Sequence, residues 1–140
     1  MGGFGVLCIS MKVLVVEDEP LIRLGLASTI EDAGYEVVEA VSADDAIRRL
    51  EQTEGIELVL TDVDMPGSMD GIRLAHYVNR RWPPIRLVVI SGKVGLTPGQ
   101  LPAGARFMTK PYQEPALINM VETMMGSGGP GGGSSGGSAA

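Results

Sequence analysis

Short runs of apolar residues recur along the chain, separated by longer segments in which apolar residues follow a helical period. Five of these runs have the length of a strand: residues 12–16, 35–40, 57–61, 86–90 and 106–109. The first, third and fourth are almost continuously apolar instead of alternating with polar residues. Continuous runs of Val, Ile and Leu are typical of strands buried on both faces, as in a parallel sheet.

Segments with helical periodicity lie between and after these strands, at residues 20–33, 42–53, 69–82 and 114–125. In the first of them, Ile22, Leu26 and Ile30 share one helix face, and Gly34 is a suitable residue to end the helix. Ser42 is a suitable N-cap for the second. Strands that alternate with helices predict a doubly wound α/β fold. We expect a five-stranded parallel sheet in the flavodoxin-like order 2-1-3-4-5.

The connection between the fourth and fifth strands departs from this pattern. It reads "GKVGLTPGQLPAGAR" and is rich in glycine and proline. Thr97 could cap a helical turn that begins at Pro98, but Pro102 would break it four residues later. The fourth helix is therefore expected to be missing or reduced to a short turn. Val94, Leu96 and Leu101 would then cover that part of the sheet.

The two ends of the chain lack the pattern of the central part. Residues 1–10 precede a second methionine and are expected to be a leader, a tag or a loose arm. Residues 126–140 are rich in glycine and serine, which predicts a flexible tail, either an added linker or a native tether. The folded domain is therefore expected at residues 11–125, with no output domain after it. The tail also allows an origin within a larger hybrid kinase.

Charge and composition exclude several classes of function. The 140 residues carry a formal net charge of −6, which argues against direct binding to nucleic acid or anionic lipid. The apolar part of the leader is too short for membrane insertion. Cys8 is the single cysteine, so a reducing, cytoplasmic location is the default expectation. His76 is the single histidine and is expected at the surface, so sites that need several imidazoles are excluded.

Carboxylates follow the ends of two strands that this sheet order makes neighbours. Glu17 and Asp18 come after the first strand, and Asp62 comes after the third. Neighbouring strands lie about 4.7–4.9 Å apart, so Asp18 and Asp62 should nearly touch. Two charges about 4 Å apart repel by roughly 4 kcal/mol at an effective dielectric constant near 20. The cluster therefore calls for a cation, and hard oxygen ligands with open water positions suit Mg²⁺.

Two further polar groups should reach the same edge of the sheet. Ser91 ends the fourth strand and Lys110 ends the fifth. A cation, an ammonium group and a hydroxyl around one aspartate form a cradle for a phosphoryl group. An aspartate in that position could attack phosphorus and hold an acyl phosphate.

Four motifs in this order carry a resemblance to a known family. The stretches "VLVVEDEP", "TDVDMPGSMDG", "VVIS" and "FMTKPY" resemble the receiver domain of bacterial two-component response regulators. The resemblance covers roughly residues 11–125. It implies a phosphoacceptor that receives phosphate from a sensor histidine kinase or a histidine phosphotransfer protein. It also implies that the phosphorylated domain acts on a downstream protein that the sequence does not identify.

The resemblance assigns the ligands of the metal and the acceptor of the phosphate. Asp62 stands three residues before the Met-Pro pair and is implied to be the phosphoacceptor. Asp18 is implied to be a direct Mg²⁺ ligand, and Glu17 to assist through water. The backbone carbonyl of Asp64 would complete the protein's share.

The resemblance also assigns the residues that respond to phosphate. Lys110 would contact the phosphoryl group, and the peptide bond between Lys110 and Pro111 is expected to be cis. Ser91 would be the switch hydroxyl. Phe107 fills the place of the family's switch aromatic, although it could equally be a plain core residue.

Two features depart from the family pattern. The reduced fourth helix alters a face that receivers commonly use to dimerise, so the family's dimer mode is not carried over. Asp64 and Lys93 each lie two residues after a site residue, and we hypothesise that they pair across the mouth of the site and limit entry of hydrolytic water. They could instead be two solvated charges.

Two other functions compete with this interpretation. A haloacid-dehalogenase-type phosphatase also places Asp-x-Asp after an apolar strand, with Asp62 as nucleophile and Asp64 as general acid. In that family, however, the motif lies on the first strand and the second acidic cluster follows it. The other alternative is a receiver-like binding module that never carries phosphate. Turnover of phosphate monoesters would favour the phosphatase, and stoichiometric labelling would favour the receiver.

Overall fold

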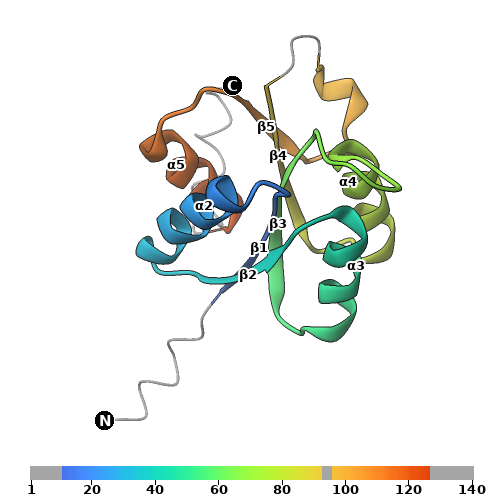
Figure 1. The fold of residues 1–140 in the computed structure, drawn as a ribbon, viewed down its shortest axis with the longest axis horizontal. Coiled ribbons are helices and arrows are strands. Elements are labelled where there is room, and N and C mark those ends of the chain that lie inside the picture. Colours follow the sequence, from blue (N-terminus) through green and yellow to red (C-terminus); the bar gives the residue numbers. More distant parts are fainter. Residues whose placement is uncertain (1–10, 93–95, 127–140) are drawn as a thin grey trace.

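The sheet contains five parallel strands in the predicted order. The computed structural model describes residues 11–92 and 96–126. The strands are β1 (Lys12–Val16), β2 (Glu36–Ala40), β3 (Ile56–Asp62), β4 (Arg86–Ser91) and β5 (Arg106–Thr109). They are arranged β2-β1-β3-β4-β5, and each pair of neighbours is parallel (Figure 1). The predicted fold class and strand order are confirmed.

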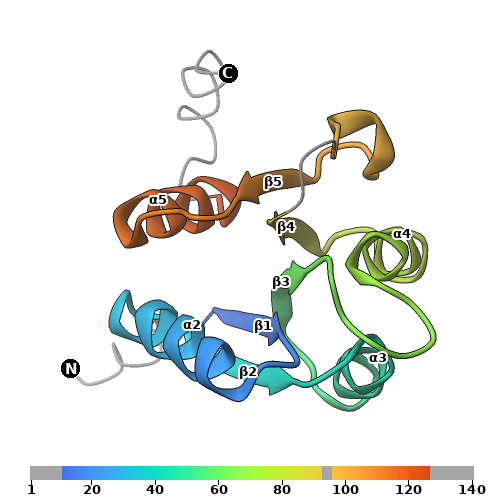
Figure 2. The ribbon, with the colours of Figure 1, turned by 45° about the horizontal axis from the view of Figure 1, so that its top comes forward.

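Helices cover both faces of this sheet. They are α2 (Pro20–Asp32), α3 (Ala43–Gln52), α4 (Gly71–Arg81) and α5 (Glu114–Met124). Figure 2 shows α2 and α5 on one face and α3 and α4 on the other. Val13 and Val15 of β1 pack in the core beneath α2 and α5, whereas Leu14 and Val16 pack in the core beneath α3 and α4. Burial on both faces explains the continuous apolar runs in the central strands.

The element boundaries follow local capping rules. The Ser42 side chain accepts a hydrogen bond from the backbone N–H of Asp45 at 3.1 Å, which confirms the predicted N-cap. Gly34 has a φ of 104°, so it ends α2 in the left-handed region as expected. The prediction for α4 was wrong by two residues at its start. Asp70 is the N-cap, and its side chain accepts from the Arg73 N–H at 2.9 Å.

The connection from β4 to β5 holds one short turn in place of a helix. This 3₁₀ turn, η1 (Pro98–Gln100), begins after Thr97, whose backbone N–H donates to the Gln100 side chain at 2.8 Å. Leu101 is buried and Leu96 packs against the core beneath α3 and α4, as predicted. His76 of α4 is half-buried rather than fully at the surface, and its Nε2 lies 2.8 Å from the Gln100 carbonyl. Val94 lies outside the described residues.

Several predictions concern parts of the chain that the structure does not describe. The leader at residues 1–10 and nearly all of the tail at residues 126–140 fall there, so their assignments stay predictions. Within residues 11–92 and 96–126, no helix has both the length and the apolar character needed to cross a membrane.

Candidate functional site

The pairing of the strands brings four strand ends to one edge of the sheet. Val16 of β1 lies opposite Thr61 of β3, so Glu17 and Asp18 follow at the level of Asp62. Asp62, the last residue of β3, lies opposite Ile90 of β4. Ser91 lies opposite Thr109, so Lys110 follows one residue beyond. The structure therefore brings together the carboxylates, the hydroxyl-bearing residue and the lysine that the sequence singled out.

Three carboxylates form a compact cluster at this edge. One oxygen from each of Glu17, Asp18 and Asp62 lies within 4.8 Å of the other two. Glu17 and Asp62 are 2 % and 7 % exposed, and Asp18 is half-buried. Water can therefore offset little of the charge on Glu17 and Asp62. A cluster of hard oxygen donors at this separation fits a divalent cation such as Mg²⁺.

The crowding of carboxylates affects the pKa of Glu17. Burial, reinforced by the neighbouring charges of Asp62 and Asp18, raises the pKa of Glu17 from 4.5 to about 7. Two groups oppose the rise in its pKa. The backbone N–H of Glu19 donates to Glu17 Oε2 at 3.0 Å, and the Lys110 ammonium attracts the ionised carboxylate. Burial is the largest of these causes, because it disfavours the ionised form of the Glu17 carboxylate.

Lys110 links the acidic cluster to the ends of β4 and β5. Its Nζ lies 3.4 Å from Asp62 Oδ1, and its backbone N–H donates to the Ser91 carbonyl at 2.9 Å. The peptide bond between Lys110 and Pro111 is cis, as predicted. The ammonium therefore lies beside the carboxylate that was singled out as the nucleophile.

The other predicted site residues have different surroundings. Ser91 is buried at the end of β4. Phe107 is half-buried and packs against the core beneath α3 and α4. Asp64 is exposed just beyond β3, and Lys93 lies outside the described residues, so the predicted pairing of these two stays a prediction.

Three residues that the sequence did not single out also shape the site. Gly71 packs so closely on β3 that a Cβ at this position would collide with the backbone carbonyl of Asp62. The Thr61 hydroxyl donates to that same carbonyl at 2.9 Å. Arg23 of α2 donates to the Glu17 carbonyl and to the Glu39 carboxylate, both at 3.0 Å. Of these three residues, only Gly71 could have been noticed in the sequence. Glycine is a weak helix former, so its position directly after the N-cap Asp70 suggests that there is no room for a side chain.

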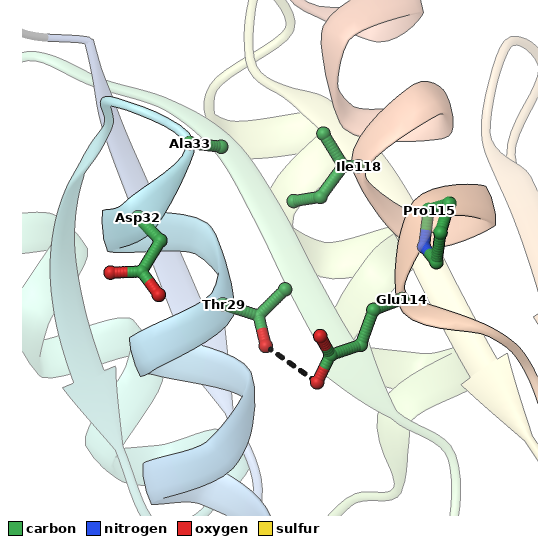
Figure 3. Close-up of a pocket in the computed structure, with 6 residues that line it drawn as sticks. All are labelled: Thr29, Asp32, Ala33, Glu114, Pro115 and Ile118. Carbon is green, nitrogen blue, oxygen red and sulfur yellow. Dashed lines mark hydrogen bonds between the residues drawn. The ribbon is translucent and has the colours of Figure 1, made fainter.

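A separate hollow lies away from this edge, between α2 and α5. Its volume is about 390 Å³, and Figure 3 shows Thr29 of α2 donating a hydrogen bond to Glu114 of α5, at 3.3 Å. None of its lining residues belongs to the acidic cluster: Thr29, Asp32, Ala33, Glu114, Pro115 and Ile118. The hollow is therefore no part of the candidate site.

Comparison with known proteins points to one family. The family model described as the response regulator receiver domain matches residues 13–122. The response regulator receiver protein CpdR of Brucella abortus is 35 % identical over 117 residues, which cover 81 % of this chain and 96 % of that protein. The sensor kinase CckA of the same organism is 34 % identical over 120 residues, which cover 83 % of this chain and 13 % of the kinase.

Solved structures agree with this match. A response regulator receiver protein from Sinorhizobium medicae superposes with a TM-score of 0.78 at 27 % identity, covering 84 % of this chain and 96 % of that one. The receiver domain of the hybrid histidine kinase CckA superposes with a TM-score of 0.69 at 30 % identity, covering 81 % of this chain and 98 % of that one. Similar chains thus occur both as nearly whole proteins and as parts of much longer ones.

Proposed function

The chain belongs to the family of response regulator receiver domains, and from this premise we propose that Asp62 accepts a phosphoryl group in a two-component phosphorelay. The observation that carries the proposal is the position of Lys110 Nζ, 3.4 Å from Asp62 Oδ1, at the edge where the three carboxylates cluster. Among the described residues, Asp62 is the carboxylate of the cluster that forms an ion pair with Lys110. Its role is that of a signalling phosphoacceptor that promotes only its own phosphorylation and dephosphorylation.

The chemical step is a transfer from nitrogen to oxygen. A carboxylate oxygen of Asp62 attacks the phosphorus of a phosphohistidine on the donor. A P–O bond forms as the P–N bond breaks, and the imidazole nitrogen keeps the electron pair and takes up a proton. The Lys110 ammonium lies where it can hydrogen-bond a phosphoryl oxygen and offset the charge that builds up during transfer.

The acidic cluster provides the ligands for Mg²⁺. Asp18 and Asp62 would bind the ion directly, Glu17 would assist through water, and the backbone carbonyl of Asp64 would complete the protein's share. When bound, Mg²⁺ neutralises charge on the phosphoryl oxygens and on the carboxylates. Three carboxylate oxygens within 4.8 Å of one another, two of them on buried residues, fit such an ion because it would offset their mutual repulsion.

Two residues beyond the cluster would respond to the phosphate. The Ser91 hydroxyl would move toward a phosphoryl oxygen and draw the β4 end with it. Phe107 would change its packing as this end moves. Asp64 and Lys93 would pair across the mouth of the site and limit entry of hydrolytic water. Lys93→Ala should therefore shorten the lifetime of the acyl phosphate.

The partners follow from this role. The phosphate donor would be a sensor histidine kinase or a histidine phosphotransfer protein, and the output would pass to a protein that docks on the phosphorylated domain. A cytoplasmic setting belongs to the same proposal. The family match and the relatives give no support to the alternative of a haloacid-dehalogenase-type phosphatase.

The proposal is tested by incubating the full chain with acetyl phosphate and Mg²⁺ and recording its intact mass over time. We expect one phosphoryl group per chain, and no labelling of Asp62→Asn. Asp64→Asn, which removes a carboxylate two residues away, serves as the matched control and should still be labelled. Continuous release of inorganic phosphate from small monoesters that depends on Asp64 would instead identify a phosphatase. No labelling of the wild-type chain would identify a binding module.

A further inference from the structure

The helix α4 carries a concentration of positive charge that the site does not use. Within Gly71–Arg81 there are three arginines and no carboxylate, although the chain has a net charge of −6. Arg73, Tyr77 and Arg80 recur at helical spacing and therefore lie on one side of α4. With Met69 and His76 they line a surface hollow of about 330 Å³, here called the α4 pocket.

Two of these arginines have no acidic partner among the described residues. Arg73 and Arg80 are both exposed, and neither guanidinium forms an ion pair within the part of the chain that the structure describes. Arg81, the third arginine of α4, differs because its Nη1 lies 3.1 Å from Glu51 Oε2. Arg81 is thus neutralised by α3, while the two arginines of the α4 pocket are available to an anionic partner.

Two of the residues that line the α4 pocket, Tyr77 and His76, are held in place by neighbouring groups. The Tyr77 hydroxyl accepts a hydrogen bond from Arg81 Nη1 at 3.0 Å, and its ring lies 6.3 Å from that of Trp82. His76 is fixed by the Gln100 carbonyl, 2.8 Å from Nε2. A partner would therefore meet an ordered Tyr77 and His76, which lowers the entropic cost of burying these two side chains.

We propose that the α4 pocket binds an acidic peptide segment of a protein partner. The two guanidiniums match carboxylates, which they can bind through paired hydrogen bonds. Met69 and the Tyr77 ring line the same hollow and together offer apolar surface to one side chain of the segment. Nucleic acid fits less well, because the hollow offers only two arginines beside apolar surface, whereas a nucleic acid is bound through many phosphate contacts.

The α4 pocket adjoins the start of the helix that packs on the phosphoacceptor strand. The Gly71 N–H donates to the Val63 carbonyl at 2.9 Å, and Gly71 lies directly against the backbone of Asp62. Met69 and Arg73 flank that contact on either side in the sequence. The docking surface is therefore joined to the site through the backbone, while none of the side chains that line it belongs to the acidic cluster. It extends beyond the proposed function of Asp62.

The test uses the full chain and a labelled octapeptide of alternating glutamate and leucine. Fluorescence anisotropy measures its affinity, and NMR titration locates it through the backbone amides that shift. We expect the shifts to centre on α4 and the affinity to fall as salt is added. The double variant Arg73→Gln/Arg80→Gln should bind about tenfold more weakly, since each exposed charged contact contributes roughly threefold.

A charge-matched control separates specific docking from general attraction. Arg86→Gln/Arg106→Gln removes the same charge from two exposed arginines on β4 and β5, and its affinity should match the wild type. Asp62→Asn should also bind normally, so failure of the proposed phosphorylation would leave this result unchanged. Equal losses in both double variants, shifts centred away from α4, or tighter binding of a single-stranded oligonucleotide of equal charge would overturn the proposal. So would self-association through α4 in place of peptide binding.

Discussion

At the scale of single residues, burial and charge oppose each other most clearly at Glu17. Its carboxylate is 2 % exposed and lies beside Asp62 and Asp18, and its pKa is raised to about 7. In the unfolded chain the same group titrates near 4.5. The folded protein therefore binds this proton more tightly than the unfolded chain, so the group stabilises the fold at low pH and loses that contribution as the pH rises toward 7.

This difference predicts a pH-dependent gain in stability for Glu17→Gln in the absence of divalent cations. At pH 8 the variant should be more stable than the wild type by on the order of 2 kcal/mol, because it removes a buried negative charge. Near pH 4.5 the two proteins should have nearly the same free energy of unfolding. Urea denaturation at both pH values measures the free energy of unfolding of each protein. A difference between the variant and the wild type that does not change with pH would contradict the raised pKa of Glu17.

The residue types and their order in the sequence predicted the charged residues of the site but not the residues that hold them in position. Asp62, Lys110 and the acidic pair could be found because each follows an apolar strand, and parallel strands bring such positions to one edge. Arg23 could not be found, because its contacts with the Glu17 carbonyl and with Glu39 depend on where α2 crosses the end of β2. Burial of Glu17 likewise depends on packing from several elements at once.

At the scale of elements, the junction between β3 and α4 determines how closely a helix approaches Asp62, the proposed phosphoacceptor. Asp70 caps α4, and Gly71 then lies against the Asp62 carbonyl with no room for a side chain. The sequence placed the start of α4 two residues too early, because Met69 and Ile72 fit the apolar period equally well. By contrast, the short turn at Pro98–Gln100 could be predicted from the cap at Thr97 and from the prolines at the start of the turn and beyond its end.

Gly71→Ala should therefore lower the free energy of unfolding by about 2–4 kcal/mol, since the new methyl group collides with backbone that cannot rotate away. Gly25→Ala is the matched control. It is also a helical glycine, but an added Cβ there meets nothing within 4 Å. Because alanine has a higher helix propensity than glycine, Gly25→Ala should be more stable than the wild type by up to about 1 kcal/mol. Thermal or urea denaturation compares the two, and equal effects would contradict the close packing at Gly71.

At the scale of the whole molecule, the proposed cation site would couple folding to cation binding. Glu17 and Asp18 follow β1, Asp62 ends β3, and Lys110 follows β5, so only the folded chain brings these groups together. A ligand that binds the folded state alone raises stability by mass action. The expected strand order and the order of the motifs in the sequence made the meeting of these groups predictable. The α4 pocket could not be predicted, because it depends on which arginines of α4 pair with α3.

Mg²⁺ should accordingly raise the melting temperature of the wild-type chain. At a hundredfold excess over the dissociation constant the gain should be about 2.7 kcal/mol, or on the order of 10 °C. Asp18→Asn should abolish the response because it removes a ligand and part of the repulsion. Asp32→Asn, which removes an exposed charge at the end of α2, should respond like the wild type. An equal rise in the Asp18 variant would argue against the metal site.

The most direct test of the central claim locates the phosphate in the chain. The protein is phosphorylated with acetyl phosphate and Mg²⁺, the acyl phosphate is reduced with borohydride, and the modified residue is identified by peptide mass spectrometry. Reduction converts a phosphorylated aspartate to homoserine, so the position survives digestion. We predict homoserine at position 62 alone. Homoserine at position 18 or 64, or at no position while labelled phosphate is bound, would contradict the assignment of Asp62 as the phosphoacceptor.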